Sequence, residues 1–251
     1  MPSSQDITRF LNKTLRTRSI RDASRNGLQV KTPKKIRKIG FAVDACLSTF
    51  QKAKKLNVDL LIVHHGIYWK GQKDNTGVLK KRVQFLKKNK MGLYASHLPL
   101  DLHETYGNNI ELARLLGLAN IRKFGNYHGI AIGYQGRLST SSTLRILAKK
   151  LDNKIGSKSI LLAFGKKKIR TIGIVSGGGS SALSESYQKK LDCFITGEAP
   201  HQVYHEAKDR GQNVILAGHY ETETVGVKAL MPLLRKKFGI QTVFISNPTL
   251  I

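Results

Sequence analysis

The stretch IRKIGFAVD (residues 36–44) recurs as IRTIGIVSG (residues 169–177). This repeat is the main evidence in the sequence for the architecture of the protein. When the same register is kept without a gap, Asp59 in DLLIVHHG falls opposite Asp192 in DCFITGEA. A match that continues through two consecutive blocks indicates an internal duplication.

A third block extends the duplication along the chain. With the second copy shorter, YASHLPLD (94–101) faces LAGHYETE (216–223), and both blocks end in His-x-x-x-acid. Three blocks in the same order predict two related halves, which we take as residues 1–125 and 126–251.

Short apolar runs alternate with helix-like segments in both halves. The runs that read as strands are KIGFAVD, VDLLIVHH, MGLYASH, TIGIVSG, LDCFITG and NVILAGH. The segments with helical spacing between them are STFQKAKKLN, VLKKRVQFLKKN, SALSESYQKK and PHQVYHEAKDRG. This alternation predicts α/β halves in which helices cover a mainly parallel or mixed sheet. A Ser/Asp start signal and an apolar stripe in SSQDITRFLNKTL add an N-terminal helix.

Composition limits the class of protein. The chain has 251 residues and is 40% hydrophobic, enough for a folded core. Neither a signal-peptide pattern nor an apolar run of membrane-spanning length is present, so we expect a cytoplasmic protein without a membrane partner. Cys46 and Cys193 are too few for a disulfide framework.

The net charge is +27, from 43 basic and 16 acidic side chains. Residues 1–125 hold 25 basic and 8 acidic side chains, a net +17, which leaves 18 and 8, a net +10, for the remainder. Because both halves are basic, the charge is not a detachable tail. It favours contact with nucleic acid or another polyanion, and solubility is the alternative explanation.

The unusual polar residues follow the predicted strands. Ligands of open α/β sheets gather beyond the carboxyl ends of strands, where loops converge. The residues at these ends are His64 and His65 after LLIV, His97 and Asp101 after GLYAS, Glu198 after CFITG, and His219 and Glu223 after VILAG. Adjacent strand residues point to opposite faces, so His64 and His65 can share a target only where the chain leaves the sheet, which Gly66 marks.

Imidazoles and carboxylates together form a ligand set for Zn, Fe, Mn, Co or Ni. If a helix begins at His219, the i, i+4 spacing puts Glu223 on the same face. Three histidines and two carboxylates, one of them bridging, would suit two divalent metal ions about 3.5 to 4 Å apart.

A glycine-rich segment, SGGGSSA (176–182), lies between a predicted strand and a predicted helix. The backbone N–H groups of Gly177, Gly178 and Gly179 could hold an anion, although a plain tight turn fits equally well. The segment lacks the GK[ST] ending of a P-loop.

Six blocks resemble the Nif-three-like proteins, which are named after an NGG-interacting factor and often labelled GTP cyclohydrolase I type 2 homologues. They are NGLQV (26–30), VHHGIYWKG (63–71), SHLPLDLHETYGNN (96–109), SGGG (176–179), TGEAPHQ (196–202) and AGHYETE (217–223). The resemblance implies a pair of three-layer α/β/α domains with a dinuclear metal site between them, assembled into a hexameric ring.

The family's ligands, carried over to this chain, fall on His64, His65, Asp101, His219 and Glu223, with Glu223 as the bridge. His97 and Glu198 match residues near that site, with a supporting or proton-transfer role.

We therefore expect a metal-dependent hydrolase that acts on a nucleotide-like or phosphorylated substrate. The alternatives from other classes are a basic ring that binds DNA, with a structural or regulatory metal site, and a metal carrier.

Overall fold

The structure is a computed structural model that describes residues 1–71 and 77–249. The chain forms two compact units. Unit 1 contains Met1–Leu100 and Val227–Asn247, and unit 2 contains Asp101–Gly226 with the described end of the chain. These units differ from the halves taken from the sequence, because residues 101–125 belong to unit 2, and the later part of the last helix, from Val227, belongs to unit 1 with the last strand.

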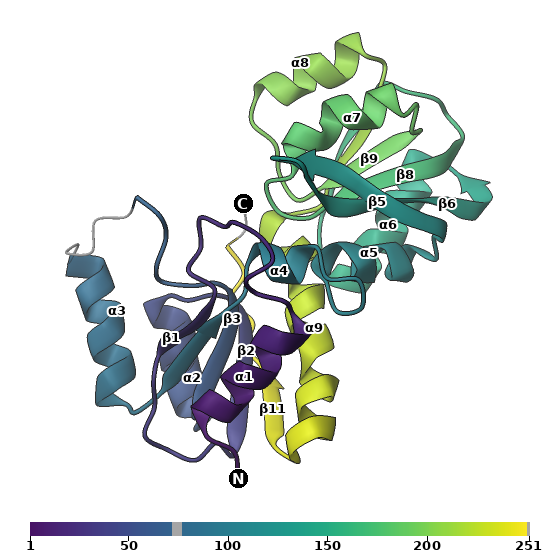
Figure 1. Cartoon of the computed structure of the whole chain (residues 1–251). Coiled ribbons are helices and arrows are strands. Elements are labelled where there is room, and N and C mark those ends of the chain that lie inside the picture. Colours follow the sequence, from purple (N-terminus) through teal and green to yellow (C-terminus); the bar gives the residue numbers. More distant parts are fainter. Residues whose placement is uncertain (72–76, 250–251) are drawn as a thin grey trace. The chain divides into compact units, whose positions relative to one another are not determined.

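Unit 1 is built on a five-stranded sheet with the order β1-β4-β3-β2-β11 (Figure 1). The strands are β1 (Gly27–Val30), β2 (Lys38–Asp44), β3 (Leu60–His65), β4 (Gly92–Ala95) and β11 (Gln241–Phe244). Only β1 runs antiparallel to its neighbour, and the other pairs are parallel. The predicted βαβ arrangement is therefore present, with an added strand at each edge.

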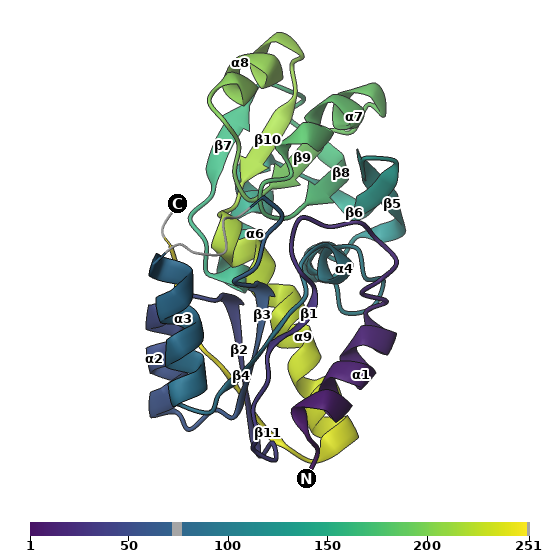
Figure 2. The ribbon, with the colours of Figure 1, turned by 60° about the vertical axis from the view of Figure 1, so that its left-hand side comes forward.

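Helices cover both faces of this sheet, as Figure 2 shows. One face carries α2 (Leu47–Lys55) and α3 (Gly77–Lys88). The other face carries α1 (Ser4–Thr14) and the part of α9 (His219–Phe238) that belongs to unit 1, where the rings of Phe10 and Phe238 meet edge to face. Helix α1 starts as the sequence predicts, because Ser3 and Asp6 form a reciprocal capping box.

Unit 2 is built on a six-stranded mixed sheet with the order β5-β6-β8-β9-β10-β7. The strands are β5 (Ala119–Tyr127), β6 (Ile130–Ser142), β7 (Ile160–Ala163), β8 (Ile169–Val175), β9 (Cys193–Thr196) and β10 (Asn213–Leu216). The three central strands β8, β9 and β10 are parallel, and the outer pairs are antiparallel. The predicted mixed α/β class is therefore confirmed in both units.

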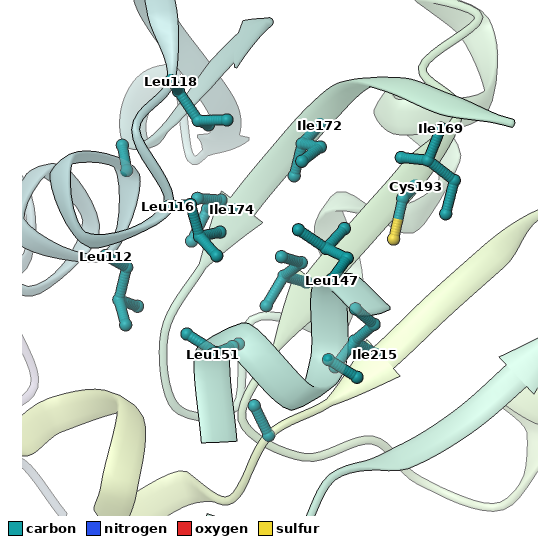
Figure 3. Packing of buried hydrophobic residues seen from close by; sticks show 14 of the residues in the cluster. Leu112, Leu116, Leu118, Leu147, Leu151, Ile169, Ile172, Ile174, Cys193 and Ile215 are labelled. Atoms are coloured by element: carbon teal, nitrogen blue, oxygen red, sulfur yellow. The ribbon is translucent and has the colours of Figure 1, made fainter. Parts of the chain in front are cut away.

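The core of unit 2 has two layers because strand residues alternate between faces. On one face, Ile172, Ile174 and Ile215 pack against α5 (Asn108–Leu116) and α6 (Leu144–Ile155), which Figure 3 shows with Leu147 and Leu151. On the other, Phe194 and Val214 pack against α7 (Leu183–Gln188) and α8 (Gln202–Asp209). A short 3-10 turn, η1 (Ser180–Ala182), precedes α7, and α4 (Leu98–Asp101) follows β4.

The duplication seen in the sequence is also a duplication of strand register. In unit 1, Ile39 of β2 pairs with Leu60 of β3, and in unit 2 Ile172 of β8 pairs with Cys193 of β9. Both partners are displaced by 133 positions, since 39 + 133 = 172 and 60 + 133 = 193. The first two blocks of the repeat therefore occupy equivalent places.

The third block is shifted by one residue from the sequence alignment. Ala95 of β4 pairs with Val63, and the equivalent partner of Thr196 is Leu216. The alignment instead sets Ala95 opposite Ala217. The second copy therefore has one extra residue between the end of its strand and His219.

The two aspartates that the repeat aligns accept equivalent backbone hydrogen bonds in the two units. Asp59 Oδ2 accepts the N–H groups of Arg37 (2.9 Å) and Lys38 (3.2 Å). Asp192 Oδ2 accepts those of Arg170 (3.0 Å) and Thr171 (2.9 Å). Each carboxylate thus ties the start of one central strand to the start of the next.

Candidate metal centre

Unit 1 brings three histidines together at the carboxyl end of its sheet. His64 and His65 are the last residues of β3, and His97 lies two residues beyond β4. Their ring centroids are 4.7 Å (His64–His65), 5.0 Å (His64–His97) and 5.5 Å (His65–His97) apart. Each ring offers one nitrogen within 4.8 Å of the other two, which is close enough for a shared cation.

The Nδ1 atoms of the two strand histidines have oxygen partners. His64 Nδ1 lies 3.0 Å from the carbonyl oxygen of Ser96, and His65 Nδ1 lies 2.8 Å from Asp44 Oδ1. A carbonyl oxygen can only accept, so the proton of His64 is on Nδ1 and its lone pair is on Nε2. An Nδ1–H held by a carbonyl or carboxylate is the usual support of a metal-binding imidazole.

His97 is held by the segment that precedes β1. Its Nδ1 lies 2.9 Å from Asp22 Oδ1, and its backbone N–H donates to Asn26 Oδ1 at 2.7 Å. Burial acts to raise the pKa of Asp22, but the hydrogen bonds from His97, Asn26 and Ser24 outweigh it and hold the pKa below its usual value. An ionised Asp22 fixes the orientation of His97.

Gly66 and Trp69, which follow the histidine pair in the sequence, also belong to this end of the unit 1 sheet. The indole of Trp69 lies 5.0 Å from the ring of His97 and 5.9 Å from that of His65, and its Nε1 donates to the carbonyl of Gly66. A Cβ on Gly66 would clash with the side-chain amide of Gln29, so a larger residue here would have to displace that amide. Gly66 therefore serves close packing at the point where β3 ends.

Unit 2 supplies carboxylates. Asp101, at the end of α4, is buried, and its Oδ1 accepts hydrogen bonds from Asn108 (2.8 Å) and Ser176 (3.2 Å). Asp101 and Glu223 each offer an oxygen within 4.8 Å of the other. Two buried carboxylates this close repel each other unless a proton or cation lies between them.

His219 and Glu223 begin α9 and share one face, as the i, i+4 spacing predicts. His219 Nε2 lies 3.3 Å from Glu223 Oε1, and His219 Nδ1 lies 2.9 Å from Glu198 Oε1. Burial acts to lower the pKa of His219, but hydrogen bonds and charge from Glu223 and Glu198 raise it to about 9. Without metal His219 is therefore an imidazolium, and a cation that bound to this ring would have to displace its proton.

The glycine-rich loop, residues 176–182, packs against the cluster of His219 and Glu223. The N–H of Gly177 donates to Thr222 Oγ1 at 3.0 Å, and that of Gly179 donates to Thr196 Oγ1 at 3.1 Å. Gly177 has a φ of +59°, and a Cβ there would lie 2.2 Å from Glu223 Oε1. Two of the three N–H groups considered for an anion thus have internal acceptors. Anion binding by Gly177, Gly178 and Gly179 stays a prediction.

Each residue predicted to bind metal or transfer a proton lies in one of these two clusters. His64, His65 and His97 form the first, and Asp101, Glu198, His219 and Glu223 form the second. His103 and His128 have local roles instead: His103 Nδ1 accepts the N–H of Thr105, and His128 takes the left-handed conformation in the β5–β6 turn.

The supporting residues were missed by sequence reasoning. Asp44 could have been found, because it ends the strand next to β3 and pairs with His65 in the register. Ser176 directly follows β8 and Asn108 begins α5, but nothing in the sequence indicates that both contact Asp101. Asp22 lies outside the helices and strands and carries no signal.

The donor chemistry of both clusters fits a divalent metal ion. Imidazole nitrogens and carboxylate oxygens suit Zn, Fe, Mn, Co or Ni, and no thiolate belongs to either cluster in the described chain. The buried thiol of Cys193 lies in the hydrophobic core of unit 2, where burial raises its pKa. None of the helices in the described part of the chain combines the length and apolar character needed to cross a bilayer.

Comparison with known proteins gives one family. The family model for Duf34/NIF3 (NGG1p interacting factor 3) matches residues 2–249. A protein of Pyrococcus horikoshii named GTP cyclohydrolase 1 type 2 homolog is 46% identical over 245 residues, covering 97% of this chain and 98% of the relative.

Solved structures agree with this match. The fold is similar to that of the protein ybgI, of unknown function, with a TM-score of 0.92, 31% identity and coverage of 99% and 100% of the two chains. It is also similar to TTHA1606 from Thermus thermophilus, with a TM-score of 0.89, 40% identity and full coverage of both chains.

Proposed function

The chain belongs to the Duf34/NIF3 family, and from that premise we propose that it is a metal-dependent hydrolase of nucleotide-like or phosphorylated substrates. Its site would hold two divalent cations, and the proposed ligands are His64, His65, Asp101, His219 and Glu223.

The observation that supports this most is the orientation of the histidine rings. His64 and His65 each direct Nδ1 at an oxygen, from a backbone carbonyl and from Asp44, at 3.0 and 2.8 Å. A core histidine needs only one such bond, but two adjacent imidazoles, with a third within 4.8 Å, place several basic nitrogens together. That arrangement is costly without a cation and typical of metal sites.

Unit 2 supplies the complementary donors. Asp101 is oriented by hydrogen bonds from Asn108 and Ser176, as metal-binding carboxylates usually are. Glu223 would be the bridge, because a carboxylate has two oxygens. The absence of a side chain at Gly177 lets Glu223 Oε1 approach the backbone closely. A pair of bound cations would lower the pKa of water and neutralise charge on phosphate or carbonyl oxygens.

Proton transfer is assigned to the rim of this cluster. The side chain of Glu198 is 47% exposed, whereas that of Glu223 is 4% exposed. Glu198 therefore reaches solvent while it contacts His219, and it is placed to pass a proton to a leaving group. His97, which Asp22 holds beside Trp69, would support the site or be a metal ligand itself.

The relatives' name, GTP cyclohydrolase 1 type 2 homolog, makes GTP the first substrate to test. Purified wild type, His64→Ala and His205→Ala are analysed for bound metal, and each is then reloaded with Zn²⁺, Mn²⁺, Co²⁺, Ni²⁺ or Fe²⁺. His205 is the matched control, because it is an exposed histidine of α8 outside both clusters. Turnover is followed on GTP, other nucleotides and phosphomonoesters.

We expect metal in the wild type and His205→Ala, little in His64→Ala, and turnover of at least one nucleotide or phosphoester by metal-loaded wild type. Asp101→Ala and Glu223→Ala should abolish that turnover. Metal that binds and exchanges without turnover of any compound would instead identify a metal carrier and refute the hydrolase.

A further inference from the structure

The helices on one face of the unit 1 sheet carry an unbalanced charge. Helices α2 and α3 contain eight basic side chains and no acidic one. The basic residues are Lys52, Lys54, Lys55, Lys80, Lys81, Arg82, Lys87 and Lys88. Figure 2 shows the two helices side by side on this face, and they contact each other.

The equivalent layer of unit 2 has the opposite sign. Helices α7 and α8 contain one basic side chain, Lys208, and three acidic ones, Glu185, Glu206 and Asp209, a net charge of 1 − 3 = −2 against +8 for α2 and α3. A charge that served only solubility would have no reason to separate in this way between two copies of one architecture. The difference therefore indicates a partner for the α2–α3 face.

A groove lies along α3 on this face. It is a cavity of about 700 Å³, and its polar lining consists of Arg25, Tyr68, Lys80, Gln84 and Lys87. Lys80, Gln84 and Lys87 lie on one side of α3. The other wall comes from two segments, one with Arg25 before β1 and one with Tyr68 after β3, and the N–H of Arg25 donates to the carbonyl oxygen of Tyr68 at 3.0 Å. The Arg25 guanidinium lies 5.6 Å from the centroid of the Tyr68 ring, which holds the arginine at the rim.

The cations of this groove are not neutralised within the described part of the chain. No described carboxylate oxygen lies within 4.0 Å of the charged nitrogens of Arg25, Lys80 or Lys87. In unit 2, by contrast, Lys166 lies 3.4 Å from Asp192, and Lys189 lies 3.7 Å from Glu185. Three exposed cations around one concavity attract an anion with several charges.

The spacing of these cations suits a chain of phosphates. Lys80 and Lys87 are seven residues apart on α3, which is about 10 Å along the axis at 1.5 Å per residue. Lys81 and Lys88 repeat the same spacing on the adjoining side, along a second concavity between α3 and α2. A single small anion would use one end of this row, whereas a phosphodiester strand would use all of it.

We propose that the groove of Arg25, Tyr68, Lys80, Gln84 and Lys87, with the α2–α3 face around it, binds the phosphodiester backbone of nucleic acid without sequence preference. The lysines and Arg25 contact phosphates, and the Tyr68 ring with its arginine offers a surface for a base. An anionic membrane is a poorer fit, because these cations line a concavity that a flat bilayer surface would not enter.

The test uses the full chain with EDTA present, so that bound metal makes no contribution. Fluorescence anisotropy with a labelled single-stranded oligodeoxynucleotide is measured over a range of salt concentrations for wild type, Lys80→Gln/Lys87→Gln and Lys167→Gln/Lys168→Gln. The second double variant is the matched control, because it removes the same charge from exposed lysines of unit 2. Thermal unfolding confirms that each variant is folded.

We expect the Lys80/Lys87 variant to bind roughly tenfold more weakly, and its log Kd against log salt slope to be smaller by about 1.4, at about 0.7 per lost contact. The Lys167/Lys168 control should stay close to wild type. Equal losses in both double variants would show diffuse attraction and overturn the proposal, as would absence of binding by wild type. Selective loss of binding to vesicles of anionic lipid, with oligonucleotide binding unchanged, would also overturn it.

Discussion

The β2–β3–β4 segment of unit 1 and the β8–β9–β10 segment of unit 2 share one backbone plan and differ in chemistry. The first two strands of each segment pair in the same register, and Asp59 and Asp192 hold the strand starts in the same way. At the opposite end of the strands, unit 1 presents three histidines, whereas unit 2 presents a histidine between two glutamates.

This comparison separates the positions that set the architecture of each unit from the positions that differ in chemistry between the units. Residues at the amino ends and in the core repeat because they set register and packing. Residues at the carboxyl ends of the strands and on the outer helices can differ between the units, because the structure of the sheet does not depend on their chemical type. At these ends unit 1 offers imidazoles, and unit 2 offers carboxylates with one imidazole.

The largest effect is expected from equivalent core residues. Ile39 and Ile172 occupy matching places in β2 and β8, and both are fully buried. Ile39→Ala and Ile172→Ala should each lower the free energy of unfolding by about 2–5 kcal/mol, because each leaves a cavity. Urea unfolding followed by circular dichroism measures both. A cost below about 1 kcal/mol in either variant would break the equivalence of the two cores.

The paired aspartates come next. Asp59→Ala and Asp192→Ala each leave two backbone N–H groups without their acceptor, at a cost of about 1–3 kcal/mol. Asp59 should be the more costly to lose, since its side chain is 6% exposed and that of Asp192 is 12% exposed. Urea unfolding ranks the two variants, with Asp209→Ala on the surface of α8 as control. A neutral Asp59→Ala would remove this aspartate from the shared plan.

The pH dependence of metal binding should depend on His219. Its pKa of about 9 means that metal displaces a proton at neutral pH, so affinity should rise by up to about tenfold per pH unit below pH 9 and level off above it. Calorimetric metal titrations between pH 6 and 10 measure the profile. Glu198→Gln should move the break to lower pH, and an unmoved break would exclude Glu198 as a cause.

The stability of the metal-free protein should also depend on the titration of His219, but it should fall as the pH rises. The folded pKa of about 9 lies above the unfolded value of about 6.5, so this contribution is complete below pH 6.5 and is lost as pH rises through 9. Urea midpoints in EDTA at pH 6 and pH 10 should differ less in Glu198→Gln than in wild type. An identical difference would contradict the assignment.

The smallest effect is optical. Trp69 is the only tryptophan, and its ring lies 5.0 Å from His97 and 5.9 Å from His65. Co²⁺ or Ni²⁺ bound to these histidines should quench its fluorescence, with Zn²⁺ as the diamagnetic control. His65→Ala should remove the quenching at low metal concentration. Quenching that persists unchanged in this variant would place the metal away from unit 1.

Local patterns in the sequence predict much of this fold. The α1 capping box, the strands of the repeat and the start of α9 at His219 are confirmed, because each depends on neighbouring residues. Strand β5 was not predicted, since most of its residues are exposed and show no apolar alternation. Its turn to β6 is set by the left-handed conformations of His128 and Gly129. The place of β11 beside β2 depends on a contact between distant segments.

For the candidate site, too, the sequence indicates the main residues but not the residues that orient them. The repeated His-x-x-x-acid blocks and the strand-end histidines identify the residues that the two clusters contain. The residues that orient them, such as Asp22 for His97 and Ser176 for Asp101, follow only from three-dimensional contacts. The same limit explains the one-residue shift at His219, because an insertion after a strand leaves the flanking residue types unchanged.

Calorimetric titration of metal-free protein with Zn²⁺ or Mn²⁺ tests most directly whether the two units share one metal centre. Wild type should bind two ions per chain. His64→Ala in unit 1 and Glu223→Gln in unit 2 should each weaken both ions, and the double variant should be little worse than either single one. Two single variants that each lose one ion and leave the other unaffected, with additive loss in the double variant, would contradict a shared centre.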